Sequence, residues 1–365
     1  MNANVDADMK ANSIDEILKR RRIIITCGTG GVGKTTVSAA LAMRAAQLGK
    51  RAAVITIDPA RRLATSLGLT ELSETPVDLT RNLREAMPSH KIDGTFSALM
   101  PNAKANFDDF VKELSASKTI AEQIARNPLF QIFTKEFSGT NEYMALERLQ
   151  ALDLTGQFDC IILDTPPSRN ALAFLNAPKL VAELFEERLI RWLVLPANRL
   201  LSAGMRKALG ILEKLTGAGF MTNLLDFAST LFSVRVQFLA NFEKTTRLLQ
   251  SEAVGFIMVT TPTPEAAPDV HHFVRTLQEH RFHFEGLTIN RTIGYLFKST
   301  SKPNQATSPG LPVLEGIRKR EEQAMRALSS GNIRICAMLP ELARDIHSVE
   351  DLLYVANAFE THHAQ

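Results

Sequence analysis

Cysteine is scarce in this sequence: three occur in 365 residues. Cys27, Cys160 and Cys336 are far apart, so they provide neither a Cys-x-x-Cys metal pair nor the dense disulfide framework of a small secreted domain. Each lies in or beside an apolar run that we predict to be a buried strand. We therefore expect free thiols that pack as small hydrophobic side chains, in a reducing, cytoplasmic location.

The sequence also lacks an excess of charge of one sign. Lys and Arg number 42 against 39 Asp and Glu, which gives a formal net charge of +3. This balance produces no general field that would attract nucleic acid or an anionic membrane. We expect no nucleic-acid partner, and any anion-binding site must be local.

Long hydrophobic runs are missing as well. The most apolar stretch is interrupted by Arg188, Arg191, Pro196 and Arg199, whereas a membrane span needs about 18 or more apolar residues in succession. The N-terminus, MNANVDAD, is acidic where a secretory signal would be basic and then apolar. We expect a chain that does not cross a membrane.

Short apolar runs alternate with helical patterns along the chain. We predict strands over residues 23–26, 53–57, 160–163, 255–260, 287–290 and 333–339, and helices over residues 34–48, 264–280, 312–329 and 348–361. This alternation is typical of an α/β fold with a mainly parallel sheet flanked by helices. We expect a single domain over residues 1–365, with helical insertions at about 65–150 and 170–250 that form a subdomain.

A glycine-rich loop lies between the first predicted strand and the helix that follows it. Residues 28–36, GTGGVGKTT, match the pattern G-x-x-x-x-G-K-[ST]. In this pattern backbone N–H groups converge on phosphates at a helix N-terminus, Lys34 reaches the terminal phosphates and the Thr35 hydroxyl binds Mg²⁺. The other expected nucleotide-binding positions of the loop are Gly28, Thr29, Gly30, Gly31, Val32, Gly33 and Thr36.

Two acidic residues follow predicted buried strands directly. Asp58 comes directly after the strand over residues 53–57, and Asp164 comes directly after the strand over residues 160–163. Open α/β sheets bind ligands at the carboxyl ends of their strands. Each carboxylate could organise the water around Mg²⁺ or orient an attacking water, or it could cap the helix that follows.

The glycine-rich loop and the segments that begin at Asp58 (DPA) and Asp164 (DTPPS) resemble the P-loop, switch I and switch II of the arsenite-pump ATPase (ArsA) family. That family includes the ATPases that target tail-anchored proteins, and it belongs to the SIMIBI class of dimerising P-loop NTPases. The resemblance extends to residues 172–178, 286–290 and 339–345.

The resemblance implies an ATPase that uses ATP and Mg²⁺. In the family's scheme, Lys34 and Asp58 would be catalytic, Asp58 by orienting the hydrolytic water. Thr35 would bind Mg²⁺ directly, and Asp58 and Asp164 would hold water molecules around the ion. Asn290 would read adenine.

Pro340 would lie near the base, in the late loop that begins at residue 339. The family holds nucleotide between two subunits, and its helical subdomains open and close with the nucleotide. The chain carries only one glycine-rich phosphate loop, so two chains are needed, either as a homodimer or as a heterodimer with a paralogue.

One departure from the family concerns position 29. The family has a lysine there that reaches the partner's nucleotide, and this sequence has Thr29. Arg61, Arg62 or Arg169 could supply the missing charge, or a paralogue could bring its own lysine. The chain could also be a weakly active nucleotide-binding subunit.

An apolar stripe recurs at steps of three or four residues between positions 220 and 242, as in one face of a helix. Its members that we single out are Phe220, Leu224, Phe227, Leu231 and Phe238. The stripe could receive an apolar helix of a client or membrane protein. It could equally be the packing surface of a helical subdomain.

We expect an ATPase of this family that targets or chaperones apolar or membrane-associated clients. Two alternatives stay open. One is the catalytic subunit of an arsenite-type efflux pump, which requires a membrane partner. The other is the weakly active subunit of a heterodimer.

Overall fold

The computed structural model describes residues 13–57, 62–88, 92–101, 127, 140–165, 220–293, 311–342 and 345–361. The chain forms two compact units. The first comprises Met1–Pro101, Leu149–Leu172 and Leu248–Gln365, and the second comprises Asn102–Arg148 and Ala173–Arg247. Within the described ranges, no helix is both long enough and apolar enough to cross a membrane.

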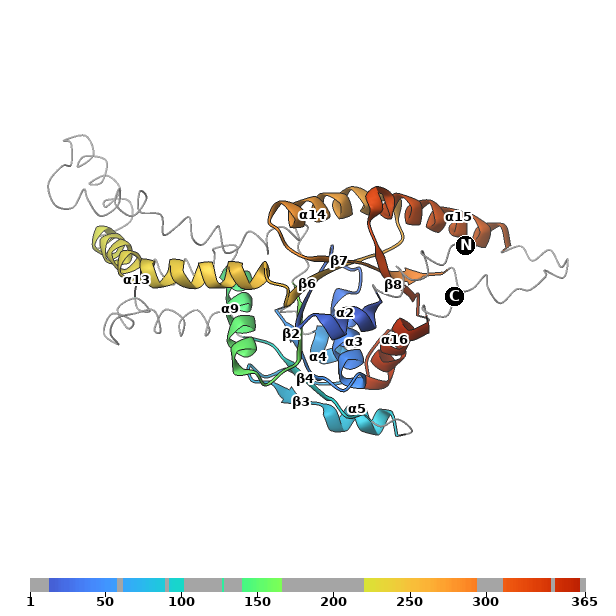
Figure 1. Ribbon diagram of the computed structural model, residues 1–365, viewed down its shortest axis with the longest axis horizontal. Coiled ribbons are helices and arrows are strands. Elements are labelled where there is room, and N and C mark those ends of the chain that lie inside the picture. Colours follow the sequence, from blue (N-terminus) through green and yellow to red (C-terminus); the bar gives the residue numbers. More distant parts are fainter. Residues whose placement is uncertain are drawn as a thin grey trace. The chain divides into compact units, whose positions relative to one another are not determined.

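The first unit contains an eight-stranded sheet with the strand order β3-β4-β2-β5-β1-β6-β7-β8 (Figure 1). The strands are β1 (Ile23–Cys27), β2 (Arg51–Thr56), β3 (Val77–Asp78), β4 (Thr95–Leu99), β5 (Cys160–Asp164), β6 (Val254–Thr260), β7 (Phe284–Thr292) and β8 (Ile335–Pro340). Neighbouring strands pair in parallel except β3 and β4, which are antiparallel. The prediction of an α/β fold with a mainly parallel sheet is confirmed.

Helices cover both faces of this sheet (Figure 1). The helices on one face include α2 (Ile14–Arg20), α3 (Lys34–Gln47) and α16 (Val349–Thr361), and those on the other include α14 (Ala267–Glu279) and α15 (Leu311–Leu328). The remaining described helices are α4 (Arg62–Ser66), α5 (Thr80–Ala86), α9 (Thr140–Thr155), α13 (Phe220–Leu249) and the short 3-10 turns η2 (Pro264–Ala266) and η4 (Ser330–Asn332).

The central strands are mainly apolar because both faces of the sheet are covered. Every residue of β1, β5 and β6 is buried, as expected for parallel strands between helical layers. Helix α3 contacts the sheet, α2 and α16, and it is buried among them through small side chains, Ala39, Ala40, Ala42, Ala45 and Ala46. This close packing fixes the start of α3 beside the carboxyl end of β1.

Two strands lie where the sequence predicts a mainly helical insertion. Strand β4 pairs with β2, and β3 pairs with β4, so the helical insertion predicted at about 65–150 is wrong at residues 77–78 and 95–99, where the chain joins the sheet. The run TFSAL in β4 contains small and polar residues, and its burial comes from its neighbours in the sheet. The glycine that precedes β4 is required by this packing. A Cβ on Gly94 would lie 2.4 Å from the carbonyl oxygens of Ala46 and Lys50.

In the second unit, two hydrogen bonds join segments that are distant in sequence. Thr245 Oγ1 donates to Glu147 Oε1 at 3.1 Å, and Asn127 Nδ2 donates to the Asn223 carbonyl at 2.8 Å. Helix α13 includes the backbone of the apolar stripe. The side chains of Phe220, Leu224, Phe227, Leu231 and Phe238 lie outside the described part of the structure.

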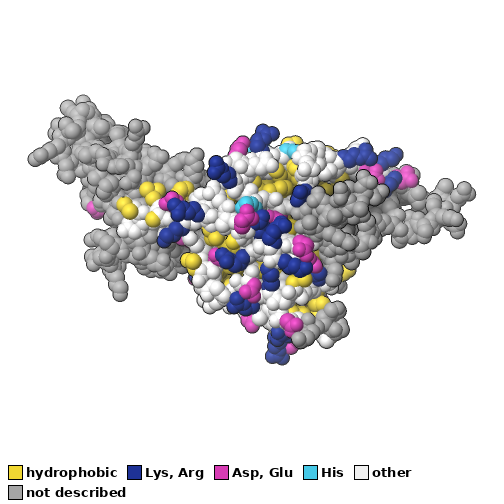
Figure 2. All heavy atoms as spheres, viewed as in Figure 1, with side chains coloured by type: hydrophobic (Ala, Val, Ile, Leu, Met, Phe, Trp, Pro, Cys, Tyr) yellow, Lys and Arg dark blue, Asp and Glu magenta, His cyan; other side chains and the backbone are white. Residues whose placement is uncertain are grey.

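The cysteines lie in strands, as predicted. Cys27 and Cys160 are fully buried, and burial raises the pKa of each thiol to about 12. Cys336 is partly exposed. On the face drawn in Figure 2, basic and acidic side chains are interspersed over the described surface, in keeping with the small net charge.

Candidate functional site

The glycine-rich loop connects β1 to α3 and needs glycine for steric reasons. A Cβ on Gly28 would lie 2.2 Å from the Val259 carbonyl oxygen, so the loop passes directly against the end of β6. A Cβ on Gly33 would lie 2.3 Å from Asn290 Nδ2, and Gly33 has a φ of +89°. Side chains at either position would displace the backbone that opens α3.

Lys34 is the first residue of α3, and its side chain turns back over this loop. Nζ donates a 2.9 Å hydrogen bond to the Thr29 carbonyl, and the residue is 5% exposed. The ammonium group and the unsatisfied N–H groups at the helix N-terminus therefore concentrate positive charge in one place. Such a cradle is suited to an anion that carries several phosphates.

Asp164 is the last residue of β5 and is fully buried. Oδ2 accepts a 2.9 Å hydrogen bond from Thr56 Oγ1, and Oδ1 accepts one of 3.3 Å from Ser38 Oγ. Burial raises the pKa of Asp164 to about 6, and the hydrogen bonds from Thr35 and Thr56 oppose this shift.

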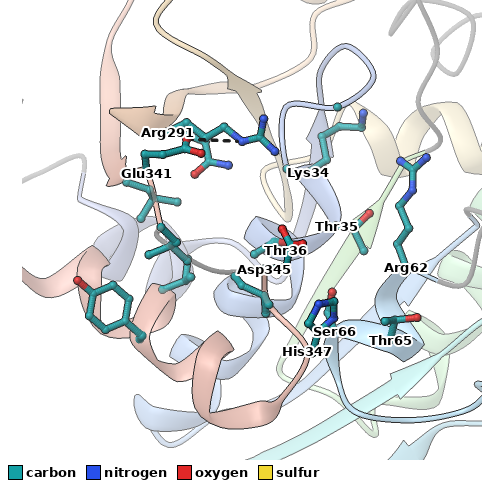
Figure 3. Close-up of a pocket in the computed structure, with 18 of the residues that line it drawn as sticks. Lys34, Thr35, Thr36, Arg62, Thr65, Ser66, Arg291, Glu341, Asp345 and His347 are labelled. Atoms are coloured by element: carbon teal, nitrogen blue, oxygen red, sulfur yellow. Dashed lines mark ion pairs between the residues drawn. The ribbon is translucent and has the colours of Figure 1, made fainter. Parts of the chain in front are cut away.

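A cavity of about 470 Å³ opens in front of the loop, entirely within the first unit. Its lining includes Lys34, Thr35 and Thr36 from the start of α3, and Arg62, Thr65 and Ser66 from α4 (Figure 3). The volume lies within the range of sites for small ligands and cofactors.

The other end of the cavity is formed by the ends of β7 and β8 and the residues after them. Asn290 and Pro340 line it, as do Arg291 and Glu341, whose side chains form an ion pair with a 3.8 Å separation (Figure 3). The Asn290 side chain also touches the glycine-rich loop, because Nδ2 donates a 2.9 Å hydrogen bond to the Val32 carbonyl.

The structure thus brings most of the predicted site residues together. Gly31, Gly33, Lys34, Thr35, Thr36, Asn290 and Pro340 line one cavity. Gly28, Thr29, Gly30 and Val32 complete the loop behind it, and Asp164 contacts Ser38 in the helix that follows the loop. Asp58 lies outside the described residues.

Sequence reasoning missed the hydroxyl groups around Asp164. Thr26, Ser38 and Thr56 are each fully buried and hydrogen bonded. The available signal was a threonine at the end of each apolar run, in IIIT and AVIT, because a buried polar side chain must find a partner.

The oxygen groups at this site fit a magnesium ion. Mg²⁺ takes oxygen ligands and usually keeps several water molecules beside one or two protein groups. Here the Thr35 hydroxyl lines the cavity, and a hydroxyl that donates its proton to a carboxylate keeps its oxygen lone pairs for an ion.

Comparison with known proteins identifies the family. The family model for anion-transporting ATPases matches residues 21–303. A Prosthecochloris vibrioformis protein named as an arsenical pump-driving ATPase is 29% identical over 157 residues, which cover 43% of this chain and 36% of that protein. An "ATPase get3" of Aspergillus terreus is 30% identical over 178 residues, covering 47% of this chain and 48% of that protein.

A longer match with lower identity is "ATPase ARSA1" of Chlamydomonas reinhardtii, 23% identical over 299 residues, which cover 76% of this chain and 36% of that protein. In these three alignments the chain spans between 36% and 48% of the length of the relative. The family model, in contrast, matches well over half of the chain. The protein therefore belongs to the anion-transporting ATPase family.

Proposed function

We propose that this protein binds ATP with Mg²⁺ in the cavity beside the glycine-rich loop and hydrolyses it to ADP and inorganic phosphate. The observation that carries this proposal is the cavity itself. Lys34, Thr35 and Thr36 line it together with Asn290 and Pro340, so one hollow offers both a phosphate cradle and a wall for a base.

At the phosphate end, the chain's own groups supply binding and charge stabilisation. The backbone N–H groups at the start of α3 and the Lys34 ammonium would hold the β- and γ-phosphates. Magnesium, held by the Thr35 hydroxyl and by water that Asp164 orients, would supply further positive charge to the phosphates. Asp58, two residues after Thr56 at the end of β2, would orient the attacking water.

The reaction we propose is the attack of water on the γ-phosphorus of ATP. A bond forms between the water oxygen and phosphorus, the bridging β–γ bond breaks, and the bridging oxygen leaves as part of ADP. Phosphoryl transfer depends mainly on positioning and electrostatic stabilisation, and the described groups are of the kind that supply both.

We also propose that two chains cooperate, as the family resemblance implies. Thr29 cannot supply the cation that the family has at that position. Of the three arginines that could replace it, Arg62 lies within the described residues, and it lines the cavity, which supports a source of charge within the same chain. Analytical ultracentrifugation of the purified protein with and without ATP tests whether two chains associate. A monomer under both conditions would contradict the proposed cooperation of two chains.

For the biological role, we propose that ATP drives the delivery of an apolar or membrane-associated client. The spacing of the apolar stripe on α13 supports this, and the names of the relatives include both get3 and arsenical pump-driving proteins. Charged residues at Leu231 and Phe238 should abolish the ability of the ATP-loaded protein to keep a hydrophobic peptide in solution. Stimulation of hydrolysis by arsenite would instead favour the pump.

Phosphate release from ATP tests the proposed reaction. The purified chain should release phosphate in the presence of Mg²⁺ and stop when EDTA is added. Turnover that persists in EDTA would contradict the role of the metal. The absence of ATP binding at any Mg²⁺ concentration would contradict the proposed function as a whole.

A further inference from the structure

Three neighbouring strands carry polar residues at the same level of the sheet. In the parallel register, Asp164 on β5 pairs with Thr56 on β2 and with Thr26 on β1. Residues at matched positions of adjacent strands point to the same face, and Ser38 of α3, which covers this face, contacts Thr26 and Asp164. All four residues are 0% exposed.

The carboxylate of Asp164 is held on both of its oxygens by different elements. Thr56 Oγ1 donates to Oδ2 at 2.9 Å, and Ser38 Oγ lies 3.3 Å from Oδ1. Ser38 Oγ is in turn 2.6 Å from Thr26 Oγ1, which also lies 3.1 Å from the Leu163 carbonyl oxygen. Thr56 of β2 therefore holds one carboxylate oxygen. Ser38 of α3, whose hydroxyl also lies 2.8 Å from the Lys34 carbonyl oxygen, contacts the other oxygen.

This cluster stabilises the interior less than apolar side chains would. A buried carboxylate loses its hydration, and an apolar side chain of similar volume would usually give a more stable core. Sequence-distant residues nevertheless supply the hydroxyl groups that fix it, since Thr56 and Asp164 are 108 positions apart. The cluster lies directly beneath the glycine-rich loop, where orientation matters more than stability.

The group that gains from a fixed carboxylate is Thr35. Thr35 lies one turn before Ser38 on α3, and its side chain lines the cavity (Figure 3). Hydrogen bonding from Thr35 lowers the pKa of Asp164. A hydroxyl has one proton, so a Thr35 hydroxyl that donates to Asp164 presents its oxygen lone pairs to a cation in the cavity. If the carboxylate rotates, the hydroxyl loses this orientation.

We infer that Thr56 and Ser38 are positioning residues for magnesium: they fix the Asp164 carboxylate, which orients the Thr35 hydroxyl toward the ion. The inference rests on the proposed function and adds to it two residues that touch neither the nucleotide nor the metal. Groups that orient metal ligands in this way typically contribute a factor of about 10–100 to metal affinity.

The test measures how Mg²⁺ tightens the binding of a fluorescent ATP analogue to the full chain. The variants are Thr56→Val, which keeps the shape but removes the hydroxyl, Thr56→Ser, which restores it, and Ser38→Ala. Thr288→Val is the matched control, because Thr288 is also 0% exposed in a strand and its hydroxyl meets the Cys336 thiol, far in sequence from the loop.

In EDTA, all variants should bind the analogue within about twofold of the wild type. The Mg²⁺ concentration that gives half of the tightening should rise about tenfold or more in Thr56→Val and in Ser38→Ala. Thr56→Ser and Thr288→Val should match the wild type. Circular dichroism melting establishes whether each variant is folded. If Thr56→Val does not fold, Ser38→Ala provides the test, since alanine is favourable in a helix.

A wild-type Mg²⁺ requirement in the folded variants would overturn this inference and leave the proposed function intact. An increase in Thr288→Val equal to that in Thr56→Val would also overturn it, because the effect would then be one of general stability. If the wild type fails to bind the analogue at any Mg²⁺ concentration, the proposed function itself is wrong.

Discussion

The side-chain amide of Asn290 donates a 2.9 Å hydrogen bond to the backbone carbonyl of Val32. This bond ties the end of β7 to the glycine-rich loop across 258 positions of sequence. The same amide nitrogen would lie 2.3 Å from a Cβ on Gly33. The glycine-rich loop and the residues at the other end of the cavity are therefore in direct contact.

Replacing Gly33 by alanine should weaken ATP binding at least about tenfold. The new Cβ would strike Asn290, and a φ of +89° is strained for alanine, which costs about 1–3 kcal/mol. Gly49→Ala is the matched control: Gly49 has a φ of +85° but open space around its Cβ. Calorimetric titration should show normal ATP affinity in Gly49→Ala, and normal affinity in Gly33→Ala as well would refute this account of the loop.

Asn290→Ala should separate base recognition from loop support. With Nδ2 bonded to Val32, Oδ1 can accept a hydrogen bond from the exocyclic amino group of adenine. Loss of that bond should weaken ATP about tenfold. The affinity of the variant for tripolyphosphate, which has no base, should fall less than about threefold. An equal loss for both ligands would mean that Asn290 only supports the loop.

The buried carboxyl of Asp164 should make the protein less stable as pH rises, when neither metal nor nucleotide is present. Its pKa in the folded chain is about 6 because burial disfavours the charge, against about 3.9 when unfolded. Between about pH 4 and 6 this carboxyl holds more protons in the folded than in the unfolded state, so its contribution to the free energy of unfolding falls as pH rises through this window.

Asp164→Asn should therefore flatten the pH dependence of urea unfolding measured in EDTA. The stability of the variant relative to the wild type should increase from pH 4 to pH 7, by at most about 3 kcal/mol. Wild type and variant curves that stay parallel over this range would show that Asp164 does not titrate there.

The parts of this fold that the sequence predicts are those with local causes. The β-branched run of β1, the glycines after it and the alanine-rich α3 identify strand, loop and helix without reference to the rest of the chain. Strand β4 has no such pattern, because its place in the sheet depends on β2 and β3. Its burial is a tertiary effect.

The hydroxyl cluster beneath the loop could not be predicted for a similar reason. Thr56 and Asp164 meet because β2 and β5 are neighbours in the sheet, and the sequence predicts parallel strands but not their order. The loop residues, by contrast, are specified by spacing alone, because the phosphate-binding pattern is contiguous. Asn290 was found through the family resemblance and not through any local pattern.

The turnover of Lys34→Ala tests the central claim most directly. Lys34 supplies a buried ammonium group at the start of α3, and its loss should reduce Mg²⁺-dependent phosphate release at least about a hundredfold while the melting curve stays cooperative. Lys50→Ala is the control, since Lys50 donates to the Lys19 carbonyl beyond the other end of α3 and should keep normal turnover. Wild-type turnover in Lys34→Ala would contradict the account.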